Sequence, residues 1–583
     1  MKAEDLKKHI PEIMRVMRIL ILLLLVFEYP IAGKCLVLLV FVEIAVGKGR
    51  YNEGLAIFIN VALIYLTVFA GGSYIKVNLF VFVCMIALCI QLVMKLWAMA
   101  LEKVDFIRNS ERFTRDIHIK VRYIVLVMVV SISTVFTLAI TPYSDMPEVS
   151  EGYKATFEVD SFYSDKVSCD RAMVIDDNGE ALGRRISLIE NAKTEIIMCA
   201  FNFKSDTSGK QMLAALLKAA ERGVSVKLLL DGFNSLLYVE GNPYFMALAR
   251  NENVEIKIYN EVSVFSPSKG MSRMHDKYII ADDEVYILGG RNTYDYFLGD
   301  QEGYKNYDRD VLVYNTGGLD SSIYNLKAYF MEMWLHEECE EWDAYLISGL
   351  LPSVHSAQRE LNEVYRTMKA ERTEWFEKPN YTNITVQTDK ITLMSNPTNI
   401  YTKEPTVLYG LSQLMEKAKD EVVIHTPYVI VGEYMNEVLS NVCDNARVEL
   451  VTNVAKNNDN MFGAVDYVIH KQEILDTGAT ILEYDGKGMY HAKSITIDDD
   501  ISIVGSFDMD FKSTYHDTEL MLVIDSCEFN ERLKASHFNY ENESNVAEVE
   551  EGEFGIVLES KGFGKMLQGV FIRMLDPHFR FLY

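Results

Sequence analysis

The chain has 583 residues and a formal net charge of −26, and 49% of its residues are hydrophobic. This length allows roughly three or four domains. The acidic balance argues against a nucleic-acid-binding protein, because such proteins usually present a basic surface. The eight cysteines include no Cys-x-x-Cys pair, which argues against a zinc site or a disulfide framework.

The N-terminal part of the chain is basic and apolar. Residues 1–141 carry 16 Lys and Arg against 10 Asp and Glu, a net charge of +6, so the other 442 residues carry −32. Four apolar runs, most of them near the roughly 20 residues that cross a bilayer core, predict transmembrane spans. They lie at about Met17–Val46, Leu55–Ala70, Val77–Leu101 and Val121–Ile140. A cleaved signal peptide would explain only the first run, so we expect a multi-span membrane region at residues 1–141.

The number of spans depends on the first apolar run. Glu28, Pro30 and Lys34 interrupt it, so the run forms one long helix or a hairpin of two, giving four or five spans. Basic residues gather before it and in the loop Glu102–Arg122, and cytoplasmic loops collect Lys and Arg. Both segments lie inside only if the number of spans is odd. We therefore expect five spans, a multi-pass location in the cell membrane, and a body on the extracytoplasmic side.

The body contains an internal repeat. Residues 142–165 are polar and predict a linker. After them, Asn191–Phe201 resembles Lys417–Pro427, and further similar blocks follow in the same order. We therefore expect a duplicated domain, with one copy at residues 166–375 and the other at 376–583.

Each copy alternates strands and helices. In the first, Glu195–Ala200 and Val224–Leu230 are short β-rich runs, and Gly209–Arg222 has apolar residues at helical spacing. This alternation predicts an α/β fold, in which each copy is a β-sheet flanked by helices and the two pack face to face as a pseudo-dimer. The second copy repeats the order, with strands at Glu421–His425 and Val448–Thr452 and a helix near Tyr434–Cys443.

A His-x-Lys-x4-Asp tetrad occurs once in each copy, followed by a glycine-led turn. A single match arises by chance in about one chain of this length in twenty-five, taking average composition. Two matches, each with its turn at the same distance, indicate a shared chemical role. The tetrads comprise His275, Lys277 and Asp282 in the first copy and His491, Lys493 and Asp498 in the second.

Two imidazoles and two ammonium groups suit displacement at a phosphodiester. On a strand, residues i and i+2 project to one face, so each histidine should point with its lysine. A neutral imidazole can attack phosphorus and form a covalent intermediate. The other histidine can protonate the leaving oxygen and later deprotonate the incoming alcohol. The lysines stabilise charge on the non-bridging oxygens, so we expect an enzyme without a metal or other cofactor.

An acid downstream of each tetrad can hold the second ring nitrogen of a catalytic histidine. Asp310, in DRDVLV, and Glu519, in DTELMLV, each begin a strand-like run at a comparable distance past the tetrads. We predict that they orient the two imidazoles. The alternative for each is a solvated acid at a strand end.

These residues resemble the phospholipase D superfamily, which is defined by a doubled His-x-Lys-x4-Asp, and within it the bacterial cardiolipin synthases. Leu288–Gly299 is similar to that group's Gly-Gly-x-Asn turn, and Gly505–Glu519 to its second motif. The similarity covers about Arg184–Tyr583. It implies that His275 is the nucleophile and His491 the acid/base. It also implies phosphate contacts from Lys277, Lys493, Asn292 and Ser506, and oriented imidazoles through Asp310 and Glu519.

The second motif departs from the family's pattern at three positions. Asp508 and Asp517 stand where the family has Asn, and Lys512 replaces Arg. An acid that faces a phosphate repels it unless the acid is protonated or turned away. These departures therefore concern the pose of the substrate around the second motif.

The resemblance implies a membrane phosphatidyltransferase that makes cardiolipin from two phosphatidylglycerol molecules through a phosphohistidine. Phospholipase D-type hydrolysis, or head-group exchange with another alcohol, is the nearest alternative. A catalytically weakened membrane scaffold and a nuclease are further alternatives. Two complete tetrads argue against the scaffold, and the acidic body argues against the nuclease. The expected partners are a phospholipid substrate and membrane lipid, with no nucleic acid, and the sequence leaves the oligomeric state open.

Overall fold

The structure is a computed structural model that describes part of the chain. The described residues are 139–263, 266–342, 351–549, 572 and 580–583. The predicted spans of residues 1–141, their number and their orientation lie outside these residues, apart from the last few. No helix within the described part is long and apolar enough to cross a membrane.

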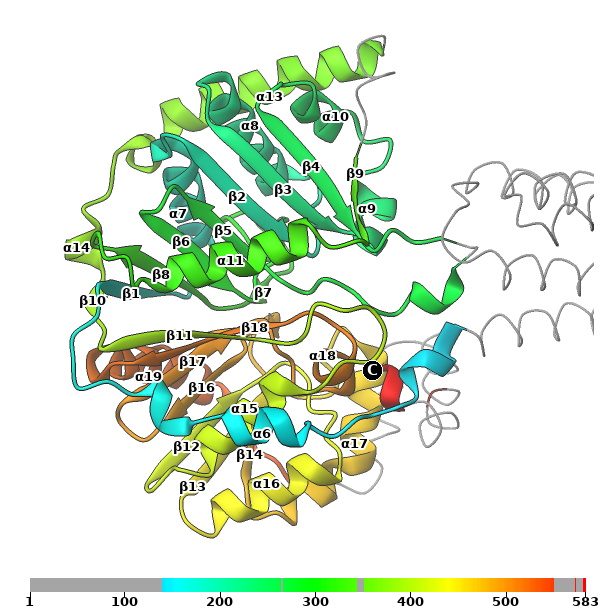
Figure 1. Cartoon of the computed structure of the whole chain (residues 1–583), viewed down its shortest axis with the longest axis vertical. Coiled ribbons are helices and arrows are strands. Elements are labelled where there is room, and N and C mark those ends of the chain that lie inside the picture. Colours follow the sequence, from blue (N-terminus) through cyan, green and yellow to red (C-terminus); the bar gives the residue numbers. More distant parts are fainter. Residues whose placement is uncertain (1–138, 264–265, 343–350, 550–571, 573–579) are drawn as a thin grey trace, which may run out of the picture. The chain divides into compact units, whose positions relative to one another are not determined.

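The first half of the body is a mixed nine-stranded sheet with the order β10-β1-β8-β6-β5-β2-β3-β4-β9 (Figure 1). Strands β2, β3 and β4 are parallel to one another. The strands are β1 Asp170–Ile175, β2 Glu195–Ala200, β3 Ser225–Asp231, β4 Val254–Tyr259, β5 Tyr278–Ala281, β6 Val285–Gly289, β8 Asp310–Asn315, β9 Cys339–Glu341 and β10 Val386–Gln387.

Helices cover the outer face of this sheet, and their buried side chains form one apolar core with it. The predicted strand at Glu195–Ala200 has the bounds of β2. The predicted helix is α8, which begins where the Asp206 side chain accepts from the Gly209 N–H and ends before Gly223, at a φ of 91°. The helices of this half are α7 Asn178–Asn191, α8 Thr207–Glu221, α9 Gly232–Tyr238, α10 Pro243–Ala249, α11 Ser322–Trp334, α13 Pro352–Glu371 and α14 Tyr381–Ile384.

The second half is an eight-stranded sheet with the order β11-β18-β17-β16-β12-β13-β14-β19. Helices α15, α16 and α17 cover its outer face (Figure 1). The strands are β11 Lys390–Ser395, β12 Glu421–His425, β13 Arg447–Asn453, β14 Thr480–Tyr484, β16 Ser494–Ile497, β17 Ile501–Gly505, β18 Leu520–Asp525 and β19 Ser544–Val546. The helices are α15 Thr406–Met415, α16 Glu433–Cys443, α17 Met461–Leu475, α18 Phe511–Tyr515 and α19 Cys527–Glu541.

The two sheets share a third apolar core, which joins the halves. Helix α11 of the first half contacts β11 of the second sheet, and α19 of the second half contacts β1 of the first. Leu326, Phe330, Leu522 and Leu533 are fully buried in this shared core. Burying one such side chain contributes roughly 1.5–3 kcal/mol, so the interface is an integral part of the fold.

The structure changes two expected boundaries. The predicted linker packs on the second half: Phe162 is buried in its core, and the Ser150 hydroxyl donates to Glu404 Oε1 at 2.7 Å. It contains the short helix α6, Glu151–Thr156. Its few apolar residues gave little sign of this packing. In addition, β10 belongs to the first sheet although it follows residue 376, so the chain enters the second sheet only at β11.

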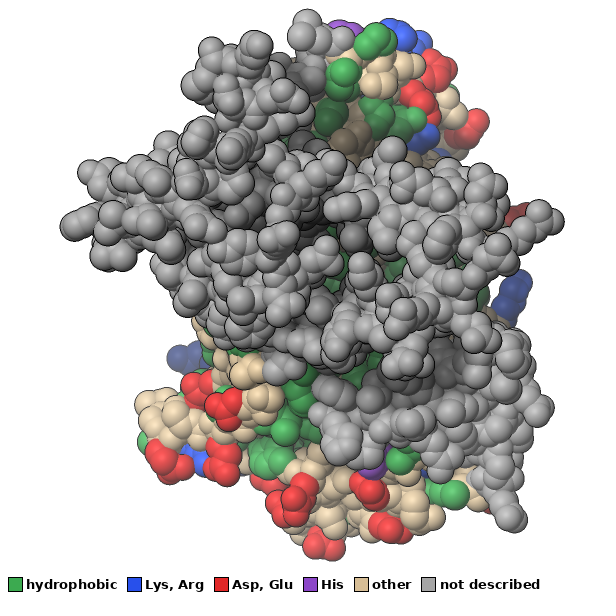
Figure 2. Space-filling model, turned by 90° about the vertical axis from the view of Figure 1, so that its right-hand side faces the viewer, with side chains coloured by type: hydrophobic (Ala, Val, Ile, Leu, Met, Phe, Trp, Pro, Cys, Tyr) green, Lys and Arg blue, Asp and Glu red, His purple; other side chains and the backbone are tan. Residues whose placement is uncertain are grey.

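Figure 2 shows one face of the molecule. Where this face is described, Asp and Glu side chains predominate over Lys and Arg along its lower edge. This pattern accords with the acidic composition of the body.

Candidate active site

The two His-x-Lys pairs lie immediately before strands β5 and β16, not within them as the sequence predicted. β5 begins at Tyr278 and β16 at Ser494, each directly after the lysine. The four side chains are almost fully buried: His275 is 9% exposed, His491 6%, and the two lysines 3% or less.

A short backbone ladder between the halves positions His491. Strand β7, Asn306–Tyr307, pairs in parallel with β15, Met489–Tyr490. The His491 N–H then donates to the Tyr307 carbonyl at 2.6 Å. This ladder fixes His491 beside Asp308, the residue that follows Tyr307.

The same arrangement, with the halves exchanged, positions His275. Met274 forms a parallel bridge with Thr518, and the His275 N–H donates to the Thr518 carbonyl at 3.3 Å. Glu519 follows Thr518 as Asp308 follows Tyr307. Each histidine is therefore positioned by the half that does not contain it.

Each imidazole also contacts a carboxylate from the opposite half. His275 Nδ1 lies 2.8 Å from Glu519 Oε1, and His491 Nδ1 lies 2.7 Å from Asp308 Oδ2. Both acids are fully buried. A carboxylate on Nδ1 leaves Nε2 of the same ring for the substrate. The structure thus brings Glu519 to an imidazole, as the sequence predicted.

The prediction for Asp310 is wrong: Asp308 takes its place. Asp310 Oδ2 accepts from Arg185 at 2.9 Å and from Arg291 at 3.1 Å, both buried. Sheet register explains the error. Gly289 lies opposite Asp310 and Gly505 opposite Met521, so the residues two positions earlier, Asp308 and Glu519, are equivalent. DRDVLV contains both aspartates, and only the register separates them.

Asp282 and Asp498 lie away from the imidazoles, in the turns after β5 and β16. Asp282 accepts from three successive backbone N–H groups that end with Glu195, the first residue of β2. Asp498 does the same for three that end with Glu421, the first residue of β12. Both have positive φ, 53° and 46°. Their predicted catalytic role is therefore replaced by a structural one, tying each turn to a neighbouring strand.

Both lysines contact their own histidine. Lys277 Nζ donates to the His275 carbonyl at 2.5 Å, and Lys493 Nζ donates to the His491 carbonyl at 2.7 Å. Lys493 Nζ also lies 2.7 Å from His491 Nδ1 and 3.3 Å from Asp508 Oδ1. Burial lowers the pKa of Lys277 to about 8, with Glu519 opposing the shift and Lys493 adding to it.

Charges from one half act on the other, which indicates a single site. Burial lowers the pKa of His275 well below its usual value, and the ammonium groups of Lys277 and Lys493 lower it further. Burial raises the pKa of Glu519 well above its usual value, although Lys277 opposes the shift. Burial also raises the pKa of Asp308, but Lys493 and the hydrogen bond with His491 outweigh it and bring that pKa to about 2.

Burial therefore affects the two carboxyl groups with opposite outcomes: the pKa of Asp308 is low and that of Glu519 is high. The low pKa of His275 keeps its ring neutral near neutral pH, and a neutral imidazole is the form that attacks phosphorus. Asp308, ionised beside His491, can stabilise positive charge on that ring during proton transfer.

Ser506 and Asn292, which were predicted to contact phosphate, differ in the contacts that they make in the structure. Ser506 Oγ donates to Glu519 Oε2, and Ser513 Oγ donates to Glu519 Oε1 at 2.6 Å. Ser506 therefore supports Glu519 here. Asn292 is 8% exposed, and its Oδ1 has no hydrogen-bond partner among the described residues.

Two aromatic residues outside the His-x-Lys-x4-Asp motifs pack against the imidazoles. Phe201 is edge-on to His275 at 4.8 Å between ring centroids, and Phe297 is edge-on to His491 at 5.0 Å. Their positions in the sequence could have indicated them. Phe201 directly follows β2, and Phe297 lies in the YDYFLG segment that follows the first turn.

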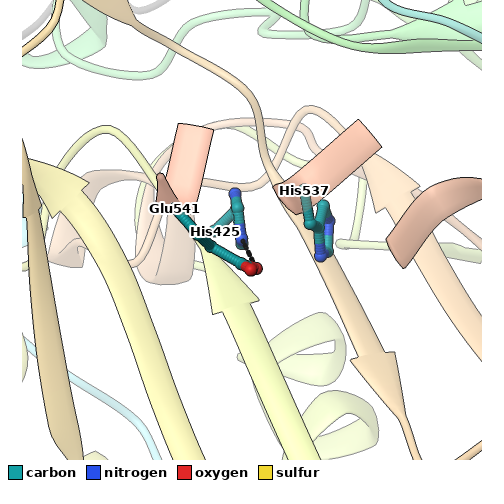
Figure 3. A group of neighbouring side chains, drawn as sticks. All are labelled: His425, His537 and Glu541. Carbon is teal, nitrogen blue, oxygen red and sulfur yellow. Dashed lines mark hydrogen bonds and ion pairs between the residues drawn. The ribbon is translucent and has the colours of Figure 1, made fainter. Parts of the chain in front are cut away.

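One group in the described residues could offer three metal ligands: His425, His537 and Glu541, whose ligand atoms lie within 4.8 Å of one another (Figure 3). The two imidazole rings are stacked at 3.7 Å with 16° between their planes. Nitrogen lone pairs lie in the ring plane, so these two do not converge on one ion as a tetrahedral site requires.

The same histidines support the second tetrad through hydrogen bonds. His425 Nδ1 lies 2.6 Å from the Tyr490 hydroxyl, and His537 Nε2 lies 2.9 Å from Ser494 Oγ. Tyr490 precedes His491 and Ser494 follows Lys493. The two histidines thus hold the residues on either side of the segment from His491 to Lys493.

Comparisons with known proteins identify the family of this chain. The sequence model of the family "Cardiolipin synthase, PLD-like domain" matches residues 186–334 and 411–540, one stretch in each half. The chain belongs to the phospholipase D superfamily and is close to the cardiolipin synthases within it.

Individual relatives give the extent of the similarity. A cardiolipin synthase of Clostridium perfringens is 26% identical over 327 residues, which cover 56% of this chain and 60% of the relative. An uncharacterized protein of Helicobacter pylori is 25% identical over 444 residues, 68% of this chain and 84% of the relative. The crystal structure of the Haemophilus influenzae phosphatidylserine synthase shares the fold, with a TM-score of 0.50 and 17% identity over 71% of this chain and 95% of that one.

Proposed function

We propose that this protein is a phosphatidyltransferase that makes cardiolipin from two phosphatidylglycerol molecules through a phosphohistidine. The observation that carries the proposal is the exchange of carboxylates between the halves, which gives one buried site two His–carboxylate pairs. We further propose that residues 1–141 anchor the enzyme in a bacterial cell membrane, with the body on the extracytoplasmic side. An anchor would hold the site beside its lipid substrates.

In the first step, His275 Nε2 attacks the phosphorus of phosphatidylglycerol. The phosphorus–oxygen bond to the glycerol head group breaks, and the leaving oxygen takes a proton from His491. A phosphatidyl group is now bound to His275. The neutral His275 and the ionised Asp308 suit these two roles.

In the second step, the hydroxyl of another phosphatidylglycerol attacks the phosphohistidine. Its proton passes to His491, the new oxygen–phosphorus bond forms and the bond to His275 breaks. Cardiolipin leaves, and both histidines return to their starting states. In both steps Lys277 and Lys493 stabilise charge on the non-bridging oxygens.

The test is a lipid assay on membranes that contain the full-length wild type, His275→Ala or His491→Ala, supplied with phosphatidylglycerol and followed by mass spectrometry. Cardiolipin and glycerol should form only with the wild type. His355→Ala, on the exposed face of α13, is the control and should match the wild type. Phosphatidic acid without cardiolipin would instead identify a hydrolase, and product that persists in both histidine variants would contradict the mechanism.

A further inference from the structure

The two glycine-led turns carry different side chains at equivalent positions. Gly289 to Asn292 and Gly505 to Asp508 follow their tetrads at the same spacing, so Asn292 and Asp508 are counterparts. One is a neutral amide and the other an acid. The repeat itself therefore identifies Asp508 as a charge that the chemistry common to both halves does not require.

Asp508 is buried beside the reacting groups. It is 4% exposed, and its Oδ1 lies 3.3 Å from Lys493 Nζ. That contact lacks hydrogen-bond geometry, and Oδ1 has no hydrogen-bond partner among the described residues. The ion pair with Lys493 compensates only part of the cost of burying this oxygen, because no donor completes a hydrogen bond to it. A ligand that donates to Oδ1 would remove this cost.

The groups around Asp508 favour a cation as that donor. The Tyr428 ring is edge-on to His491 at 6.1 Å, and its hydroxyl donates to Asp459 at 2.8 Å. The Asp510 carboxyl is near enough that Asp508 adds to the effect of burial and raises the pKa of Asp510 to about 7. An ammonium group beside Asp508 would be attracted by these carboxylates, against which Lys493 and Lys512 act.

The charge balance leads to the same conclusion. Asp508 offsets the charge of Lys493, which would otherwise be free to bind a phosphate oxygen. A glycerol head group has no charge to compensate for this loss. An ammonium group attached a few bonds from the reacting oxygen could contact Asp508 and leave Lys493 to the phosphate.

We propose that the alcohol site beside His491 also takes an amino alcohol in place of glycerol, and that Asp508 favours it through its ammonium group. This inference rests on the proposed phosphatidyl transfer. The alcohol could be a free acceptor, whose hydroxyl attacks the phosphohistidine while its proton passes to His491. It could equally be the leaving head group of an aminophospholipid, whose oxygen takes a proton from His491 as its bond to phosphorus breaks. The shared chemistry is an ammonium group close to the reacting oxygen.

The experiment compares full-length wild type, Asp508→Asn and Asp508→Glu in membranes. In one arm, labelled phosphatidylglycerol is the donor, and ethanolamine, serine and glycerol compete as acceptors at equal concentration. In the other arm, labelled phosphatidylethanolamine and phosphatidylglycerol compete as donors. The wild type should prefer the amino compound in at least one arm, and the arm identifies its source. Asp508→Asn, which keeps the size of the side chain, should lower that preference about tenfold, equivalent to about 1.4 kcal/mol.

Asp508→Glu retains the charge and should keep part of the preference, which separates selection from a fault in folding. An unchanged preference in Asp508→Asn, or a wild type that uses only uncharged alcohols, would overturn the inference. Either result leaves the proposed function intact if product still depends on His275. Loss of that dependence would instead refute the proposed function.

Discussion

At the residue scale, two aspartates two positions apart have separate roles. Asp308→Asn should lower turnover by roughly 10²–10⁴-fold, because an amide neither holds the ring nor stabilises its charged form. Its melting temperature should stay close to that of the wild type. Asp310→Asn should instead lower the free energy of unfolding, by roughly 3–5 kcal/mol if it leaves Arg185 and Arg291 unpaired. Thermal melting and initial rates, measured for both variants, separate the two roles. If both variants lost the same activity and had the same stability, this assignment would be wrong.

Lys277 predicts an alkaline limit to activity. Its pKa of about 8 means that the ammonium form predominates below that pH and is lost above it. The enzyme should therefore slow as the pH rises through about 8. Arginine stays charged at all accessible pH values, so Lys277→Arg should be slower but lose this limit. The check is the pH profile of kcat/KM for both proteins, and an alkaline limit that is unchanged in Lys277→Arg would assign it to another group.

At the scale of elements, the turns after β5 and β16 depend on their aspartates. Asp282→Ala removes the acceptor for three backbone N–H groups at a partly exposed turn, which should cost about 1–2 kcal/mol of unfolding free energy. Asp282→Asn keeps an acceptor and tolerates the positive φ, so it should cost less. Denaturant unfolding measures both. Loss of activity without loss of stability in Asp282→Ala would return Asp282 to a catalytic role.

Local patterns predicted the elements better than the site. The sequence predicted β2 and β12 with their exact bounds, because short β-branched runs leave little choice of structure. It also predicted the two His–Lys pairs and Glu519. It missed Asp308, because pairing across the two halves decides which acid reaches His491. The register depends on how two distant segments pair. It therefore cannot be predicted from DRDVLV or from the His-x-Lys-x4-Asp motif taken separately.

At the scale of the whole molecule, Arg309 links the halves behind the site. It is fully buried and donates to the Tyr490 hydroxyl at 3.0 Å and to Ser494 Oγ at 2.8 Å. It also pairs with Asp176 at 3.1 Å. Arg309→Ala should lower stability by roughly 3–5 kcal/mol, since it removes a fully buried side chain and leaves Asp176, whose side chain is 25% exposed, without its charge partner.

Because Arg309 adjoins Asp308, the same variant should lower turnover even at temperatures where it stays folded. Scanning calorimetry and rates measured well below the melting temperature test both effects. Arg309→Lys keeps the charge but loses the guanidinium that donates to the Tyr490 and Ser494 hydroxyls. Its stability and turnover should lie between those of the wild type and Arg309→Ala. Wild-type rates in the folded Arg309→Ala protein would show that this link has no part in positioning the site.

Two unlike halves form one site, in which we assign His275 as the nucleophile and His491 as the acid/base. Trapping the intermediate from a phosphatidyl ester of p-nitrophenol, whose leaving group needs no protonation, distinguishes the two roles. After rapid quenching, mass spectrometry of peptides would locate the phosphatidyl group. We predict that it lies on His275, accumulates in full-length His491→Ala and is absent in His275→Ala. A phosphatidyl group on His491, or none in any variant that still releases p-nitrophenol, would show that this assignment of roles is wrong.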